Sequence, residues 1–347
     1  GSSSRLKAAM QHSLPAKALQ SLRRLHDIPV GEVVCGGIVC TAPALLAAYL
    51  HNPLFSWSAI AAFWTYLSLV TGGFWTRLSL ALSFGVAGAL ASGLGAWTVA
   101  YPPVVIVLAA ITGFGGAVAQ GGGTRIGLPA LLAATAFAVS TAFPGKDFAH
   151  GMTYATYFLY GNLWATGFAL LLWRIEKPHA TSITEAAQAS FTLTSDLTLH
   201  GLRVGLAAAI SVGLVQYWRL DHGYWMTLTV FFIMQPKFSG TLKTSLERVA
   251  GTLLGSLLAA ALGSFIHSPL LLAALILPLS IGTLAGRSIS YRAYILFLTP
   301  HFILVAELGQ PSASELGLSI LRVCNSLGGA LLAVGISLLV YPWCGRR

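Results

Sequence analysis

The stretch YWMTLTVFFIMQPKFSGTLKTSLERVAGTLLG, residues 224–255, decides which kind of fold this chain adopts. It opens with an apolar run that ends at a Gln-Pro-Lys sequence (235–237), and a second apolar run begins at Glu247-Arg248. Apolar runs joined by short polar connections are typical of helices that cross a membrane. Ionisable residues beside such runs are costly in lipid, so they point to function.

The composition also favours a membrane protein. Of 347 residues, 56% are hydrophobic and 9% are charged, whereas about a quarter are charged in a soluble domain. So few charges could not cover a water-facing surface, and a lipid bilayer is the expected environment. The net charge of +10 would suit nucleic-acid binding, but the basic residues gather before the first apolar run and stand singly between the later ones. The positive-inside rule produces this distribution, so no nucleic-acid partner is expected.

The order of the apolar segments predicts an all-α polytopic membrane protein with about twelve transmembrane helices. The segments are residues 32–51, 57–72, 79–98, 101–118, 127–144, 152–173, 201–218, 224–236, 248–266, 269–286, 292–308 and 317–341. The second and the eighth are shorter than the roughly 20 residues of a straight span, so we expect them to be broken or strongly tilted.

The basic residues predict the orientation. With a cytoplasmic N-terminus, every Lys and Arg except Lys146, Arg203, Arg219 and Arg322 falls in a cytoplasmic piece. This bias predicts an even number of spans, with both termini in the cytoplasm.

The chain also repeats itself. DIPVGEVVCGGIVC, from Asp27, runs parallel to DLTLHGLRVGLAAA, from Asp196, and Trp57 corresponds to Trp225. Six segments in each half predict two parallel six-helix repeats, related by a pseudo-twofold axis along the membrane normal, with substrate paths between the halves. The expected domains are a basic cytoplasmic segment (1–26), the first repeat (27–173), a cytoplasmic linker (174–199) and the second repeat (200–347).

Arg248 is the first candidate for binding a substrate. It precedes Gly251 and Gly255, whose spacing lets another helix approach closely. Its guanidinium can hold a carboxylate through two parallel hydrogen bonds, and an ion pair with Glu247 is the structural alternative. Lys237, in the same predicted cytoplasmic connection, would add a positive potential that attracts anions, although topology alone also accounts for it.

Arg322 and Arg203 are further candidates. Arg322 lies near the predicted outer side, where the loop bias does not explain it, and Asn325 lies one turn away on the same helix face. A structural hydrogen bond is the alternative role for Arg322. Arg203 either snorkels to the cytoplasmic surface or pairs with Glu32, which has the corresponding place in the first half.

Two residues are candidates for proton coupling, His301 and Glu247. His301 follows Pro300 inside an apolar segment, where the proline frees a backbone carbonyl. A histidine there can carry protons near neutral pH, or it is a satisfied donor of the core. Trp225 can stack on an aromatic substrate, although tryptophans near segment ends usually anchor the chain at the membrane interface.

Motifs for catalysis do not occur in the sequence. It has no nucleotide-binding loop ending in GK[ST], no Ser/His/Asp array and no Cys/His metal spacing. We therefore expect no enzyme, no cofactor and no metal, and we expect the four cysteines to be reduced structural thiols.

The opening stretch resembles the signature W-x-x-[LM]-T…QP/EP…R-x-x-G-T-x-x-G of the fusaric acid resistance (FUSC) family, a superfamily that includes bacterial aromatic acid exporters and plant aluminium-activated malate transporters. The matching residues are Trp225, Thr227, Thr229, Gln235, Pro236, Thr241, Arg248, Gly251, Thr252 and Gly255. LRVCNSLGGALLA (321–333) resembles its later R-x-x-N/D-x-x-x-G element. The first half departs from the pattern, because Leu82 replaces the arginine before Gly85.

The resemblance implies export of small organic anions, above all aromatic carboxylates, across a bacterial inner membrane, driven by proton motive force or membrane potential. The expected substrate-binding residues are Arg248, Arg322, Arg203, Trp225, Gln235, Lys237 and Asn325, with His301 and Glu247 coupling protons. An organic-anion channel without proton coupling and a membrane assembly component without transport are the alternatives. A homodimer or a periplasmic adaptor is the expected protein partner.

Overall fold

The computed structural model describes residues 28, 30–69, 73–143, 147–175, 191–309 and 315–340. Within these ranges the regular structure is entirely helical and contains no strand, which confirms the all-α class. The helices are α3 (Val30–Tyr49), α4 (Leu54–Ser68), α5 (Phe74–Thr98), α6 (Pro102–Val118), η1 (Ala119–Gly122), α7 (Thr124–Ser140), α8 (Phe148–Ile175), α9 (Ser195–Trp218), α10 (Tyr224–Ile233), α11 (Phe238–Phe265), α12 (Pro269–Ile289), α13 (Tyr291–Gly309) and α14 (Glu315–Val340). The basic segment 1–26 and residues 176–190 of the predicted linker lie outside the described residues.

Local sequence explains where several of these helices begin. Helices α6 and α12 start with proline, which has no N–H to leave unsatisfied in the first turn. Helix α9 starts after Thr194, whose side chain accepts a hydrogen bond from the N–H of Leu197. Helix α10 is followed by extended backbone at Met234, two residues before Pro236, and the residue before a proline is itself disfavoured in a helix.

Within the part of the chain that the structure describes, seven helices are long and apolar enough to cross a membrane, judged by length and composition. They are α3, α5, α6 together with η1, α9, α11, α12 and α14. Helix α4 has 15 residues and α10 has 10, and at 1.5 Å per residue α10 extends for about 15 Å, half of a bilayer core of about 30 Å. The prediction that these two segments are too short for a straight span is confirmed, and the total of twelve transmembrane helices stays a prediction.

The outward faces of the long helices are apolar. Leu254 and Leu257 on α11 are 57% and 68% exposed, and Leu331 on α14 is 75% exposed. Leucines exposed along whole helix faces are stable in lipid and not in water. The chain is therefore a multi-pass membrane protein.

The tryptophans divide into two groups. Trp75 and Trp218 are largely exposed, as expected of interfacial anchors. Trp57, Trp64 and Trp225 are 2% exposed or less. The expectation of an interfacial role is wrong for these three, because each packs against other helices and not at the membrane surface.

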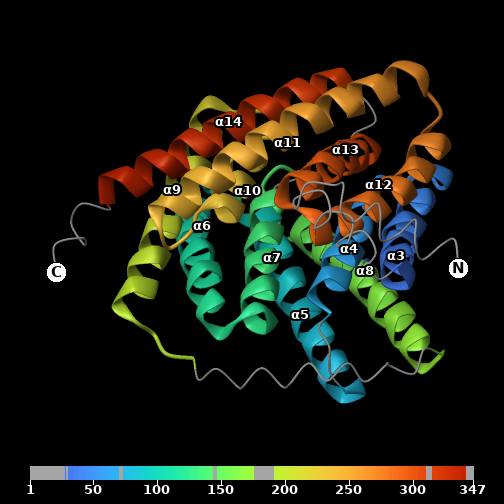
Figure 1. Ribbon diagram of the computed structural model, residues 1–347, viewed down its shortest axis with the longest axis horizontal. Coiled ribbons are helices and arrows are strands. Elements are labelled where there is room, and N and C mark those ends of the chain that lie inside the picture. Colours follow the sequence, from blue (N-terminus) through green and yellow to red (C-terminus); the bar gives the residue numbers. More distant parts are fainter. Residues whose placement is uncertain are drawn as a thin grey trace, which may run out of the picture.

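The helices pack in a recurring order. Among the first six, α5 packs on α7 and α8, and α4 packs on α3 and α8. Among the last six, α11 packs on α13 and α14, and α10 packs on α9 and α14. The two groups meet where α9 packs on α6, α3 on α12, α4 on α13 and α10 on α7. Helices α11 and α14 run side by side along one edge of the molecule (Figure 1).

Helix α11 begins ten residues before the predicted segment, at Phe238 and not at 248. The expected cytoplasmic loop is therefore helical. Thr241, Ser245 and Arg248 lie on the buried face of this extension, at helical spacing. Because these buried residues are polar, the apolar pattern of the sequence did not show the first turns of the helix.

Candidate anion-binding site

The site is built around the break between α10 and α11. Residues 234–237 are not helical, and Thr241 closes the turn, because its hydroxyl oxygen accepts a hydrogen bond from the N–H of Gln235 at 2.9 Å. Nη2 of Arg203 donates to the backbone oxygen of Pro236 at 3.1 Å. Arg203, which is 5% exposed, therefore binds a carbonyl freed by the break. It also lies at the negative end of the α10 dipole, where a cation is favourable.

Arg248 is buried on α11 near the last turn of α10. Its side chain is among the largest fully buried in the described chain, with 2% exposure. Nη1 donates to the hydroxyl of Tyr291 on α13 at 3.2 Å, and the guanidinium carbon lies 5.4 Å from the ring centroid of Phe232. A cation over an aromatic face gains favourable electrostatic energy, and the gain is larger where water is absent.

Arg322 is buried on α14 near the first turn of α10. It is 3% exposed, and its guanidinium carbon lies 5.2 Å from the ring centroid of Trp225. Arg322 and Arg248 are close enough for their charges to repel each other. Because Trp225 and Phe232 belong to the same short helix, α10 has one arginine packed near each of its ends.

Among the side chains that the structure describes, which do not include those of Glu307 and Glu315, no carboxylate forms an ion pair with Arg248 or Arg322. The only acid next to either arginine in sequence, Glu247, approaches Arg292, with Oε1 4.0 Å from Nε. The suggested ion pair between Glu247 and Arg248 is therefore wrong, because Glu247 is on the partly exposed side of α11 and Arg248 on the buried side. A buried charge without a partner is strongly unfavourable, so the pair requires either water or an anion.

The helices around the pair carry further polar atoms that lack hydrogen-bond partners. Nε of Arg248 and Nε of Arg322 are both buried and unpaired. The hydroxyls in the same condition on α11, α13 and α14 are those of Thr252, Ser256, Thr299, Ser319, Ser326 and Ser337. Native structures satisfy nearly all buried polar groups, so such a cluster indicates space for water or an ion.

Most of the buried polar atoms that lack hydrogen-bond partners lie in the second half of the described chain. Among described residues up to 175, the unpaired buried side-chain atoms are Oδ1 of Asn162 and Oγ1 of Thr166. The buried arginines and the unpaired hydroxyls therefore belong to α9–α14. This agrees with the sequence, in which the first half has Leu82 in place of the arginine before Gly85.

The glycine spacing after Arg248 has the expected effect on packing. A Cβ at Gly251 would lie 2.8 Å from Ile295, and a Cβ at Gly255 would lie 2.7 Å from the backbone oxygen of Leu296. Both contacts are with α13. The prediction that these glycines admit a close neighbouring helix is confirmed, and the close approach brings Tyr291 of α13 to Arg248.

The other predicted substrate-binding residues lie less centrally. Lys237 is exposed, and Gln235 is half-buried in the turn. Asn325 donates to the backbone oxygens of Leu321, at 2.9 Å, and of Asp221, at 3.4 Å. Asn325 therefore connects α14 to the loop between α9 and α10 through a hydrogen bond. A direct role for Lys237, Gln235 and Asn325 in substrate binding stays a prediction.

His301 lies in a different cluster from the arginines. Its Nε2 is 3.1 Å from Sγ of Cys40 on α3 and 3.3 Å from the hydroxyl of Ser280 on α12. Its ring packs edge-on against Phe63 of α4. These contacts fit the alternative of a core residue, although Nδ1 of His301 is buried without a partner among the described residues. Proton coupling by His301 stays a prediction.

Two histidines were missed by the sequence reasoning. His200 is fully buried one turn before Arg203, and neither of its ring nitrogens has a hydrogen-bond partner in the described chain. His222 is partly buried and lines a cavity.

The helices and the two buried arginines define a polytopic helical membrane protein with cationic side chains in its core. The comparisons with known proteins define the class further. Residues 208–336 match the model of the fusaric acid resistance protein-like family. This segment, which includes Arg248 and Arg322, is similar to that family, and the resemblance seen in the sequence is confirmed.

Relatives are similar over limited regions. Inner membrane protein YccS of Escherichia coli (strain K12) is 28% identical over 170 residues, which are 48% of this chain and 23% of that protein. An uncharacterized protein of Synechocystis sp., slr1298, is 29% identical over 149 residues, 43% of this chain and 20% of its own length. The chain therefore spans a quarter or less of these relatives. No solved structure matches it significantly.

Proposed function

We propose that this chain moves small organic anions, aromatic carboxylates in particular, across a bacterial inner membrane. The observation that carries the proposal is the pair Arg248 and Arg322, both buried and without an ion-pair partner among the described side chains. The family match of the segment that holds them supports the same function.

The electrostatics of the pair favour an anionic ligand. Two guanidiniums that repel each other are stabilised by an anion between them, because the anion attracts both and offers acceptors to the unpaired N–H groups. Phe232 and Trp225, over which the cations lie, provide aromatic faces beside the same space. An organic carboxylate with an aromatic ring satisfies both features.

We further propose that the path follows the pseudo-twofold relation between the halves. The recurring packing order supports two parallel repeats, because helices at corresponding places in α3–α8 and α9–α14 pack against each other in the same pairs. A local detail of the packing agrees with this. A Cβ at Gly161 would contact the backbone oxygen of Ser58, and a Cβ at Gly329 would contact that of Met226. Gly161 corresponds to Gly329 in the repeat, and Ser58 corresponds to Met226. Substrate paths commonly lie between such halves.

The first test measures flux in proteoliposomes. Purified protein is reconstituted with entrapped benzoate, and efflux is followed for the parent, Arg248→Ala and Arg322→Ala. We expect each variant to lose at least about tenfold of the parent rate, because one buried cation is removed from the anion. Arg292→Ala is the matched control, since the side chain of Arg292 is 70% exposed, and its flux should equal that of the parent.

The outcomes of this test distinguish the candidate functions. Parent-like flux in both buried-arginine variants would show that the arginines do not bind the anion. Absence of benzoate flux in the parent would favour a membrane assembly component. Flux that follows voltage and ignores a pH gradient at fixed voltage would favour a channel over a proton-coupled exporter.

A further inference from the structure

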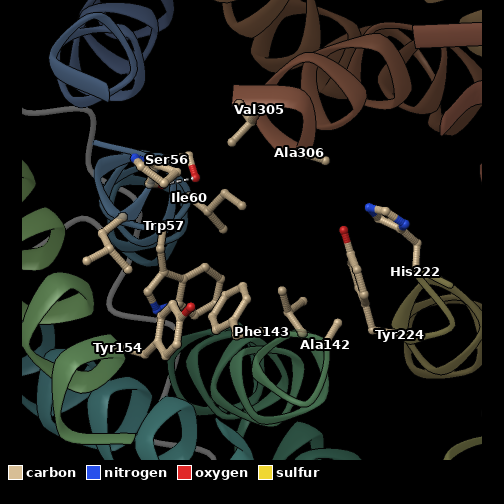
Figure 2. Close-up of a pocket in the computed structure, with 13 residues that line it drawn as sticks. Ser56, Trp57, Ile60, Ala142, Phe143, Tyr154, His222, Tyr224, Val305 and Ala306 are labelled. Carbon is tan, nitrogen blue, oxygen red and sulfur yellow. Dashed lines mark hydrogen bonds between the residues drawn. The ribbon is translucent and has the colours of Figure 1, made fainter. Parts of the chain in front are cut away.

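A small cavity lies where α4, α7 and α13 meet the beginning of α10, the end of that helix on which Arg322 packs (Figure 2). Its volume is about 90 Å³. A cavity that holds benzene has roughly 150 Å³, whereas one water molecule occupies about 30 Å³. In the structure as described, the cavity therefore has room for water and not for an aromatic acid.

His222 forms one side of this cavity, next to Tyr224 (Figure 2). Both ring nitrogens are buried and lack a hydrogen-bond partner among the described residues. The backbone of His222 is left-handed, with φ of 52°, and its ring lies 5.0 Å from that of Trp225. Neither imidazole nitrogen is hydrogen-bonded within the described chain, so the ring keeps its capacity to bind a proton beside the cavity.

Among the described side chains, which leave out that of Glu307 on α13, the charged and titratable groups around His222 are few. Asp221 precedes it in the chain, Tyr224 of α10 and Tyr154 of α8 share the cavity, and Arg322 of α14 lies behind Trp225. The side chains that α4, α7 and α13 contribute to the cavity carry no charge. Burial lowers the pKa of His222 from its ordinary value, and Asp221 acts in the opposite direction. The imidazole is therefore neutral near pH 7 and takes up a proton on the acid side.

We propose that His222 is a proton-binding residue through which the pH on its side of the membrane controls how tightly the arginine pair holds an anion. This inference rests on the proposed function. The imidazole and the guanidinium of Arg322 both pack on Trp225, at 5.0 and 5.2 Å, so they are no more than about 10 Å apart. A proton on His222 adds a third positive charge near the anion.

The sign of the effect follows from this geometry. The added charge attracts the bound anion, so protonation tightens anion binding. Two unit charges about 10 Å apart, at the effective dielectric constant of a protein, change an equilibrium by about tenfold. By reciprocity, anion binding raises the proton affinity of His222 by the same factor.

The test measures benzoate affinity by calorimetry at about pH 7.5 and about pH 5.5, where a carboxylic acid is still mostly ionised. The parent protein in detergent should bind benzoate more tightly at the lower pH, by up to about tenfold as His222 becomes protonated, and His222→Asn should bind it equally at both. Asparagine tolerates the left-handed backbone and does not titrate. His150→Asn is the matched control, because His150 is an exposed histidine, and it should keep the parent's pH dependence.

A second measurement needs no variant. Benzoate binding at the lower pH, repeated in buffers of different ionisation enthalpy, should show proton uptake. Equal parental affinity at both pH values, or parental pH dependence in a folded His222→Asn, would overturn the inference and leave the proposed function standing. Absence of benzoate binding at either pH in the parent would overturn the proposed function, and the inference with it.

Discussion

A lone buried arginine is costly in a membrane, and a pair in mutual repulsion is more costly still. The chain places Arg248 and Arg322 at the two ends of α10, and it stabilises them with a phenol and two aromatic faces. Each of these contacts leaves Nε free. The local structure is therefore suited to a site that is completed by a ligand.

Thr241 provides a prediction at the scale of one residue. It binds the N–H of Gln235 at 2.9 Å and donates to the oxygen of the same residue at 3.3 Å. Thr241→Val keeps the shape and loses both bonds, so it should lower the free energy of unfolding by about 1–3 kcal/mol. Thr153→Val is the control, because its hydroxyl bond is exposed and within its own helix. Thermal unfolding in detergent measures both, and equal melting temperatures would contradict the prediction.

At the scale of the element, the contact between α11 and α13 positions the site. Gly251 and Gly255 allow backbone to approach backbone, and Tyr291 reaches Arg248 only because α13 lies so close. The spacing of Gly251 and Gly255 was predicted from the sequence to allow close helix packing. The identity of the helix that packs there was not, because spacing alone does not specify the partner.

Gly255→Ala should destabilise the protein by roughly 1–3 kcal/mol, since its Cβ would lie 2.7 Å from the oxygen of Leu296 and from Thr299. Gly335→Ala is the matched control in α14, where a Cβ would meet nothing within 4 Å. That control should be neutral or stabilising, because alanine favours helix over glycine by about 1 kcal/mol. Unfolding of both variants by denaturant gives the comparison, and a Gly255→Ala variant as stable as the parent would refute the steric argument.

At the scale of the whole molecule, the class of fold and the positions of most helices followed from hydropathy. The first turns of α11 did not, because their buried face carries Thr241 and Ser245. Arg248 and Arg322 were identified from the sequence because a charged side chain in or beside an apolar segment is energetically costly in lipid. His222 was missed because a histidine in a short loop normally faces water, and only the folded chain shows that α4, α7 and α13 close around it.

The predicted orientation is testable by labelling from each side of the membrane. In a cysteine-free background, Arg219→Cys should react with an impermeant maleimide added outside, and Lys237→Cys only after the membrane is opened. Both parent residues are exposed, and they lie near opposite ends of α10. The reverse labelling pattern would invert the orientation, and labelling of both from outside would contradict the topology.

The shortness of α10 has an electrical consequence. Its far end meets the exposed Pro236 and Lys237, and its near end meets the cavity of His222, so the poorly hydrated stretch is about 15 Å long. In the proposed path, an anion that binds both arginines therefore lies beside this short helix, within the part of the bilayer across which the voltage falls. An anion that enters or leaves the site crosses part of that field, which is worth about 2.3 kcal/mol per 100 mV for a full crossing. The membrane potential then acts on entry and release of the anion, and the rates of those steps carry the voltage dependence of the flux.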